Sequence, residues 1–215
     1  AKSNDRASAN PSAFAPVAEE FETARSIHDQ AMTLAQSIFD GARGGRPVNC
    51  SAAKAIVADL LGSVIRSPDA NLLLVQMRRY DKGLFAHAVN VCVLSLIVAS
   101  GEDFDADIVS LGLGALLHDI GETRIPRQLL RNTGVLNDTE RRLFEQHPRL
   151  GGMLLAQSEV VSQAARQIVR DHHERIDGSG YPNHVAGDGL SLACQLVAIA
   201  DMYDEMFTGR NQAML

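Results

Sequence analysis

The sequence predicts an all-α protein, a helical bundle with an N-terminal helical subdomain. Apolar residues recur at helical spacing along successive segments, whereas no segment shows the alternating pattern of a half-buried strand. No internal repeat is present. A chain of 215 residues, of which 46% are hydrophobic, is long enough to bury a sizeable core. We therefore expect packed helices around one main core.

The first part of the chain predicts a short arm followed by three helices. Residues 1–18 are rich in Ala, Ser, Asn and Pro without periodicity, which is typical of a linker or disordered arm. Residues 19–79 form the predicted N-terminal helical subdomain. Its helices are expected over 19–39, over 51–65 with Ser51 as the N-cap, and again from the SPD sequence at 67–69.

Residues 80–215 form the second predicted domain. The segment from Phe85 to Ser100 is apolar nearly all round, so we expect a central buried helix, and His87 is its conspicuous polar residue. Asn137 with Glu140 three residues later predicts a capping box. Further helices are expected over 108–118, from Asn137 to His147, over 158–173, and from Ser191 onward after the glycine-rich loop 177–189.

Composition excludes several classes of protein. The net charge is −6 and no run of Lys or Arg stands out, which argues against a DNA-coating surface. Cys50, Cys92 and Cys194 are far apart and odd in number, so we interpret them as core thiols of a reducing compartment. No apolar stretch reaches the length of a membrane span and no signal peptide is visible, so we expect a cytoplasmic chain without membrane insertion.

Metal-ligand residue types recur at or near the ends of apolar helical segments. They are His87, His118, Asp119, His147, His172, His173 and Asp201. Imidazole and carboxylate groups are the ligands of transition metals such as Fe, Mn, Ni or Zn, and such ions activate bound water. Adjacent residues on a helix point about 100° apart. The doublets 118/119 and 172/173 are therefore expected at helix ends, where the backbone can turn both side chains inward.

A blander interpretation exists for each residue taken alone. A single histidine on an apolar helix, such as His87, is more often a hydrogen-bonded core residue than a ligand, and an HD dipeptide often arises by chance. His28 and His184 lie outside the pattern and are expected to be structural or exposed. The coincidence of five segments favours the metal hypothesis, because burying so many polar groups without a ligand would be costly.

The order and spacing of these motifs resemble the HD-GYP phosphodiesterases of the HD superfamily. The resemblance rests on YDKGLFAHAVNV (80–91), LLHDIG (116–121), EQHPRLGG (145–152), DHHERIDGSGYP (171–182) and VAIADMYDEM (197–206). It implies a bundle of the HD-domain type. It also implies hydrolysis of cyclic di-GMP to linear pGpG or GMP through a metal-bridging hydroxide, with two ions that are commonly iron or manganese.

The resemblance also implies residue roles. His87, His118, Asp119 and Asp201 would hold one ion, and Asp119, His147, His172 and His173 the other, so that Asp119 is both bridging ligand and catalytic residue. Positions 122, 204 and 210, here Glu122, Asp204 and Arg210, would face the substrate. The loop with Gly178, Gly180, Tyr181 and Pro182 is expected mainly to stiffen the structure, and alternatively to dock GGDEF-domain partners. A homodimer is possible under the same resemblance.

The sequence departs from the family pattern at three places. Gly83 stands where some members have a glutamate for a third metal, Glu122 replaces a lysine that reaches substrate phosphate, and FTGRNQ (207–212) replaces the usual TSDRPY. The chain also ends earlier than the family's last helices. A weakly active or inactive signalling module that binds nucleotide or partner proteins is therefore the alternative function, and a mononucleotide phosphohydrolase is a third.

Overall fold

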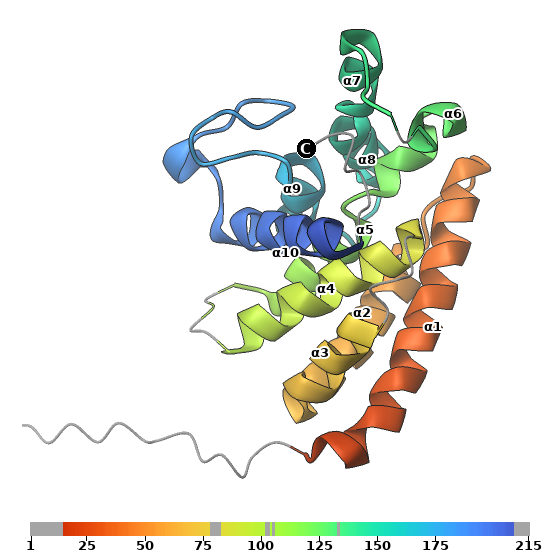
Figure 1. Cartoon of the computed structure of the whole chain (residues 1–215), viewed down its shortest axis with the longest axis vertical. Helices are drawn as coiled ribbons and strands as arrows, with labels where there is room; N and C mark the ends of the chain where they lie inside the picture. Colours follow the sequence, from red (N-terminus) through yellow and green to blue (C-terminus); the bar gives the residue numbers. More distant parts are fainter. Residues whose placement is uncertain (1–14, 78–82, 102–103, 105, 133, 209–215) are drawn as a thin grey trace, which may run out of the picture.

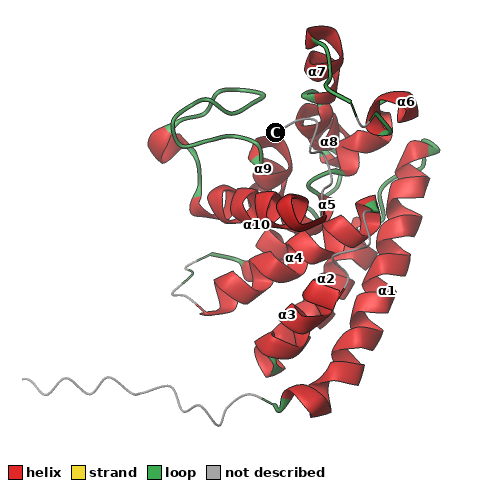
Figure 2. Ribbon diagram, in the orientation of Figure 1, coloured by secondary structure: helices red, strands yellow, loops and turns green. Residues whose placement is uncertain are grey.

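The computed structural model describes residues 15–77, 83–101, 104, 106–132 and 134–208, and this part of the chain contains helices and no strand. Figure 2 shows the helices joined mostly by short loops, with one long loop before the last helix. The elements are α1 (Val17–Arg43), α2 (Cys50–Arg66), α3 (Pro68–Met77), α4 (Leu84–Gly101), α5 (Ile108–Leu117), η2 (Ile120–Arg124), α6 (Arg127–Leu130), α7 (Asp138–Phe144), α8 (His147–Leu155), α9 (Gln163–Asp171), η3 (Gly187–Gly189) and α10 (Leu192–Thr208). The predicted all-α fold is confirmed.

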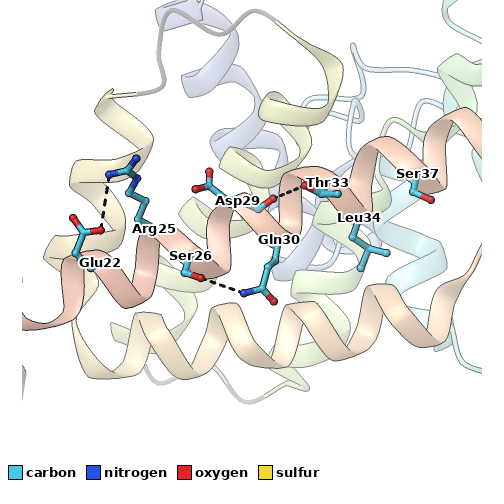
Figure 3. Close-up of a pocket in the computed structure, with 8 residues that line it drawn as sticks. All are labelled: Glu22, Arg25, Ser26, Asp29, Gln30, Thr33, Leu34 and Ser37. Carbon is cyan, nitrogen blue, oxygen red and sulfur yellow. Dashed lines mark hydrogen bonds and ion pairs between the residues drawn. The ribbon is translucent and has the colours of Figure 1, made fainter.

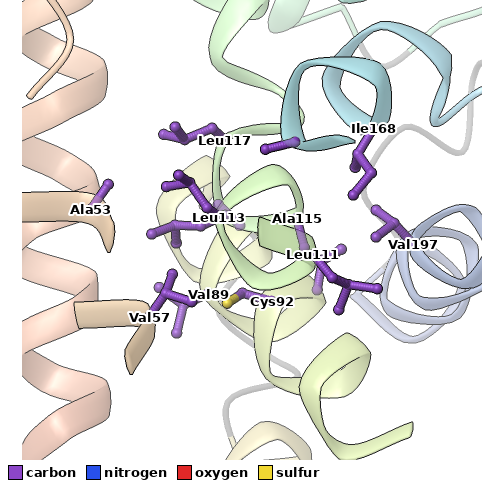
Figure 4. Packing of buried hydrophobic residues seen from close by; sticks show 14 of the residues in the cluster. Ala53, Val57, Val89, Cys92, Leu111, Leu113, Ala115, Leu117, Ile168 and Val197 are labelled. Atoms are coloured by element: carbon purple, nitrogen blue, oxygen red, sulfur yellow. The ribbon is translucent and has the colours of Figure 1, made fainter. Parts of the chain in front are cut away.

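The helix α5 lies at the centre of the bundle, in contact with α2, α4 and α9. Its sequence is apolar throughout, and the Asp107 side chain accepts hydrogen bonds from Val109 N and Ser110 N at its start. Figure 4 shows Leu111, Leu113 and Leu117 of α5 surrounded by side chains of the neighbouring helices. One hydrophobic core extends from α1 to α10 through this helix. The last residues of α5 are thereby held rigidly, and His118 follows them directly.

The helices α1 to α3 share this core with the rest of the bundle. Figure 1 shows α4 lying between α1 and α10, and α1 and α2 both pack directly on α4. The predicted boundary between the two domains, at 79/80, falls outside the described residues, as do residues 1–14 of the predicted arm. Within the described part, the N-terminal helices pack against α4 and α5.

The expectation that no apolar stretch reaches the length of a membrane span is wrong for α4, which has that length and composition, with a mean hydropathy of 1.9 over its 18 residues. Most of this helix lies inside the bundle, because 67% of these 18 residues are buried. A core helix surrounded by other helices is apolar on all sides for this reason. The expectation of a central buried helix is confirmed, and Cys92 on α4 is a buried free thiol, as are Cys50 and Cys194.

Several predicted helix boundaries were wrong. The predicted helix from Asn137 to His147 is two helices, because α7 ends at Phe144 and α8 begins at His147. The helix predicted from residue 158 starts at Gln163, with Ser162 as its N-cap. The N-cap of α2 is Asn49 rather than Ser51, and its side chain accepts from Ala52 N. The capping box of Asn137 and Glu140 is present as predicted.

A buried polar network joins α1, α2 and α3. The Glu20 carboxylate accepts hydrogen bonds from Arg66 Nε at 3.0 Å, from Arg66 Nη2 at 2.8 Å and from Ser63 Oγ at 3.1 Å. Asn71 Nδ2 donates to Ser63 Oγ, and the same amide contacts His28 Nε2 through its oxygen at 3.1 Å. His28 is fully buried, so its expected structural role is confirmed. Hydrogen bonding to Arg66 holds the pKa of Glu20 below its ordinary value, although burial opposes this shift.

The Glu20→Gln substitution is expected to lower the free energy of unfolding at pH 7 by about 1 kcal/mol, because a charged hydrogen-bonded group becomes neutral. A carboxyl with a lowered folded-state pKa stabilises the fold above its unfolded pKa of about 4.3, and this stabilisation is lost as pH falls through the folded pKa. The difference between wild type and variant should therefore shrink in acid. Urea unfolding at pH 7 and near pH 3 measures it.

The matched control for this substitution is Glu22→Gln on the same helix. The Glu22 side chain is 77% exposed and lies 3.9 Å from Arg25. Exposed pairs of this kind contribute about 0 to 1 kcal/mol. An effect of Glu20→Gln no larger than that of Glu22→Gln would contradict the proposed importance of the network.

Candidate metal centre

The seven predicted ligands converge in the structure on one buried cluster. His87 comes from α4, His118 and Asp119 from the junction of α5 and η2, His147 from the first residue of α8, His172 and His173 from the end of α9, and Asp201 from α10. Groups of three or four of these residues have ligand atoms within 4.8 Å of one another. The side chains are at most 4% exposed except for His173, which is 20% exposed. Both doublets lie at helix ends, as predicted.

Three of the histidines are oriented by the helix that precedes them. The Nδ1 atoms of His118, His147 and His172 lie 2.7, 2.9 and 3.0 Å from the carbonyl oxygens of the third residue before each. These carbonyls belong to the last turns of α5, α7 and α9, where backbone acceptors lack helical partners. A carbonyl oxygen only accepts, so Nδ1 carries the proton in each ring. Each of these histidines thus caps the helix that precedes it.

His87 is oriented by a residue from a distant helix. Its Nδ1 lies 2.7 Å from Asp204 Oδ2, and Asn90 Nδ2 donates to the other oxygen of this carboxylate at 2.9 Å. Asp204 is 3% exposed. A carboxylate that accepts from the far nitrogen of a histidine is the usual outer partner of a metal ligand. The sequence placed Asp204 among substrate contacts, whereas the structure places it behind His87.

With Nδ1 protonated, each neutral imidazole presents the lone pair of Nε2 to the interior. His87 Nε2 and His118 Nε2 are 3.2 Å apart, and so are His147 Nε2 and His172 Nε2. Asp201 Oδ1, a buried atom without a hydrogen bond, lies 3.0 Å from His87 Nε2. Lone pairs of nitrogen and oxygen at these separations repel one another unless protons or a cation lie between them. The donor set therefore fits transition-metal ions.

Asp119 faces the histidines on both sides. Its Oδ2 lies 3.4 Å from His118 Nε2 and 3.7 Å from His87 Nε2. Its Oδ1 lies 3.3 Å from His147 Nε2 and 3.7 Å from His172 Nε2. One carboxylate oxygen is thus directed to each pair of histidines.

The protonation of the cluster is divided. Burial opposes protonation of His118 and His147, but Asp119 outweighs it and the pKa of each lies above the ordinary value. Burial together with neighbouring histidines lowers the pKa of His172 and holds that of His173 well below the ordinary range. Burial is likewise outweighed at Asp201, where His87 and His118 lower the pKa. Protons alone therefore cannot satisfy all the inward lone pairs at neutral pH.

Close packing against α8 requires a glycine at position 121, the last residue of the HDIG sequence. A Cβ at this position would lie 1.8 Å from the His147 carbonyl oxygen and 2.6 Å from Gly151 N. These are backbone atoms of α8, so they cannot move without moving the helix. The absence of a side chain lets η2 pack directly on the first turns of α8. This close approach brings His147 next to Asp119.

The Gly121→Ala substitution is expected to displace α8 and to reduce the metal content of the protein to half of wild type or less. Gly152→Ala on α8 is the matched control, because a Cβ there meets nothing within 4 Å. Alanine should be neutral or stabilising by up to about 1 kcal/mol at an open helical glycine. Elemental analysis and thermal unfolding measure both variants. Equal metal content in the two would show that the close packing of η2 on α8 is not needed.

The loop after α9 holds Tyr181 over the ligand cluster. Its ring stacks on His173 at a centroid distance of 4.6 Å and an interplanar angle of 24°. Gly180 allows this, because a Cβ there would lie 2.4 Å from the His173 carbonyl oxygen and from Arg175 N. After Tyr181 in the chain, the loop is bound by the Glu174 carboxylate, which accepts hydrogen bonds from Asn183 N at 2.6 Å and from Val185 N at 3.0 Å. Burial, with Asp119 and Asp201, holds the pKa of Tyr181 well above its ordinary value, so the phenol stays protonated.

Removing the Tyr181 ring should loosen the ion held through His173, because this most exposed ligand loses the ring that covers it. Tyr181→Ala is expected to lower the affinity for one metal ion about tenfold, on the scale of the 0.5–1.5 kcal/mol of an aromatic pair. Tyr181→Phe keeps the ring and should bind metal like wild type. Competition with a chromogenic chelator measures both, with the exposed Tyr203→Ala as control. Equal affinities for the alanine and phenylalanine variants would contradict the role of the stack.

The remaining predicted residues lie in different places. Glu122 is 3% exposed and raises the pKa of His147, so it is buried beside the cluster and does not turn outward to the surface. Gly83 precedes α4 and offers no side-chain ligand. Arg210 lies outside the described residues. His184 is exposed and has a φ of 56°, which fits its predicted place outside the cluster. No pattern in the sequence indicated the roles of Asn90 and Glu174.

A cleft with a volume of about 490 Å³ opens directly above the cluster, and His172, His173, Tyr181 and Asp201 line it. A larger, shallow hollow of about 680 Å³ follows the exposed face of α1. Figure 3 shows that its polar side chains bond to one another, as Gln30 does to Ser26 and Thr33 to the Asp29 carbonyl. That hollow has the character of a solvated helix face. The cleft above the cluster is the candidate site.

The fold and the site define a helical protein with a buried centre of histidines and aspartates suited to metal ions. The HD domain family matches residues 89–214, and the chain belongs to this family. A cyclic di-GMP phosphodiesterase of Pseudomonas aeruginosa is 34% identical over 193 residues, which are 89% of this chain and 47% of that protein. A cyclic di-GMP phosphodiesterase response regulator of Xanthomonas campestris pv. campestris is 36% identical over 107 residues, 49% of this chain and 28% of the relative.

A solved structure supports the fold independently. An HDG"Y"P protein from Bdellovibrio bacteriovorus superimposes with a TM-score of 0.71 at 21% sequence identity, covering 89% of this chain and 67% of that one. These findings confirm the predicted HD-GYP resemblance. The chain spans less than half the length of the curated relatives described above.

Proposed function

We propose that this chain hydrolyses a phosphodiester bond of cyclic di-GMP, giving linear pGpG or GMP, with two transition-metal ions, iron or manganese before nickel or zinc. The position of Asp119 carries the proposal. One of its oxygens faces His87 and His118, and the other faces His147 and His172, which is the arrangement of a carboxylate shared between two ions. His173 and Asp201 complete the two ligand sets.

The residues of the chain would act by holding and orienting. His87, His118, Asp119 and Asp201 would hold one ion, and Asp119, His147, His172 and His173 the other. When bound, the ions supply an activated water for attack at phosphorus and neutralise charge on the phosphoryl oxygens. Asp204 and the three helix-end carbonyls fix the imidazole tautomers before any substrate arrives. Tyr181 covers His173 and so limits access of water from one side.

The substrate assignment is supported by two observations. The relatives named above are cyclic di-GMP phosphodiesterases, and the match to the first of them covers 89% of this chain. The cleft of about 490 Å³ is within the range of 300–1,000 Å³ common for small-molecule sites. Its position directly above the ligands would bring a bound diester to the ions. The buried free cysteines fit a reducing, cytoplasmic setting.

A weakly active signalling module is the second candidate, and Glu122 favours it. A carboxylate buried beside His147 adds negative charge next to the ligand cluster, where the family pattern has a lysine. Under this function the loop with Gly180, Tyr181 and Pro182 would dock a GGDEF domain. Tyr181 and Pro182 are half-buried and accessible in part, whereas Gly180 is buried. Docking and homodimer formation stay predictions.

Asp119→Ala is expected to abolish hydrolysis of cyclic di-GMP, by at least about a hundredfold, and to weaken retention of both ions. The reason is that this residue alone faces both pairs of histidines. Elemental analysis after gel filtration measures the ions, and chromatography of the products measures hydrolysis. His184→Asn is the control, because asparagine tolerates the positive φ of this exposed position.

Wild-type protein reconstituted with iron or manganese should hold two ions per chain. One ion or fewer would contradict the two-metal proposal. Loss of only one ion from Asp119→Ala would contradict the shared carboxylate. Two ions without any turnover of cyclic di-GMP would favour the signalling module.

A further inference from the structure

The cleft has walls that the metal ligands do not supply. Arg141 and Phe144 line it from α7 and Glu145 from the residue after that helix. Arg175 and Ile176 line it from the loop after α9, and Ile199 and Met202 from α10. The ligands Asp201, His172 and His173 form its floor. A diester at the floor would therefore extend between these walls, which belong to three separate segments.

Arg141 is a cation on a short helix whose two ends are held in place, one of them against the ligand cluster. It lies three and four residues before Phe144 and Glu145, so the three side chains share one face of α7. The Phe144 ring packs on the ligand His147 at a centroid distance of 4.7 Å. The capping box of Asn137 and Glu140 holds the other end of the helix. The Arg141 side chain is exposed, and it forms no ion pair with another residue of the described chain.

The rest of the lining offers few cations to the part of an anionic ligand that lies away from the metal ligands. Glu145, Asp201 and Glu205 all line the cleft with negative charge. Glu122 is buried beside His147 and is not among the lining residues, so the position where the family has a phosphate-contacting lysine offers no cation here. Arg141 and Arg175 are the cations of the lining in the described chain. Hydrogen bonds from Ser179 lower the pKa of Asp177, and the nearby Arg175 contributes to this shift.

Apolar side chains lie exposed in the same cleft. Ile176, Ile199 and Met202 are 59%, 63% and 43% exposed. Ile199 and Met202 are three residues apart and form one strip on α10. An apolar wall within a polar cleft suits a flat ring system with polar edges, and methionine adapts readily to such a surface. A nucleobase has this character, whereas a simple phosphodiester has none.

We propose that Arg141 binds the phosphate of a cyclic dinucleotide that does not lie at the ligand cluster, while a nucleobase packs on Ile199 and Met202. This inference rests on the proposed function and adds to it the residues that distinguish a dinucleotide from a small diester. A guanidinium binds phosphate through two parallel hydrogen bonds. The remote contacts would then favour substrates with a second phosphate and a base.

The test compares Arg141→Gln with Arg142→Gln, its exposed neighbour on α7 that does not line the cleft. Calorimetric titration of the metal-loaded proteins with a phosphorothioate analogue of cyclic di-GMP measures binding without turnover. Arg141→Gln should weaken binding about tenfold or more, and this loss of affinity should be smaller at high salt. Arg142→Gln should bind like wild type. Equal affinities of the two variants would overturn the proposal.

Kinetics separate this inference from the proposed function. Arg141→Gln should raise KM for cyclic di-GMP about tenfold and leave hydrolysis of bis(p-nitrophenyl) phosphate, which lacks base and second phosphate, within about twofold of wild type. Met202→Gln should likewise raise KM for cyclic di-GMP, and Val98→Gln, exposed on α4, should not. Equal losses on both substrates would overturn the inference. Wild-type protein inactive on both would refute the proposed phosphodiesterase, and the binding titration would still decide the role of Arg141.

Discussion

The site depends on hydrogen bonds at the outward nitrogen of four of its five histidines, His87, His118, His147 and His172. Three of these bonds run to a carbonyl of the preceding helical turn, within α5, α7 or α9. Helix ends always leave such carbonyls without partners. The same bond therefore satisfies the helix and fixes the tautomer of the ligand. This coupling explains why the ligands sit where helices end, and why the order of helices is also the order of ligands along the chain.

His87 is the exception, and it connects the cluster to the core. It lies in the first turn of α4, where free carbonyls are absent, so its acceptor must come from elsewhere. Asp204 of α10 supplies it, and Asn90, one turn further along α4, holds the second oxygen of Asp204. The packing of α10 on α4 is thus a condition for the orientation of this ligand. The N-terminal helices pack on the other side of α4 and so act on the site indirectly.

The ligand set could be predicted from the sequence because local patterns define it. Apolar helical runs that end in histidine or aspartate identify His118, Asp119 and Asp201 without any knowledge of tertiary contacts. The role of Asp204 could not be predicted in this way, since its partner His87 is 117 residues away. The break between α7 and α8 was also missed. A proline is tolerated in the first turn of a helix, so α8 begins at His147, directly before Pro148, and this new start gives His147 its direction into the cluster.

The hydrogen bonds that orient the ligand histidines are separate from the positive charge that a bound ion would supply to their lone pairs. The inward face combines several lone pairs with the carboxylates Asp119 and Asp201, and burial together with neighbouring histidines lowers the pKa of His172 and His173. Adding protons to satisfy these rings would therefore crowd positive charges in a buried space. A metal ion places its charge between the rings instead of on them, and coordinates the lone pairs in one position. The outer hydrogen bonds remain unchanged, so the framework that orients the ligands does not depend on the ions it is built to receive.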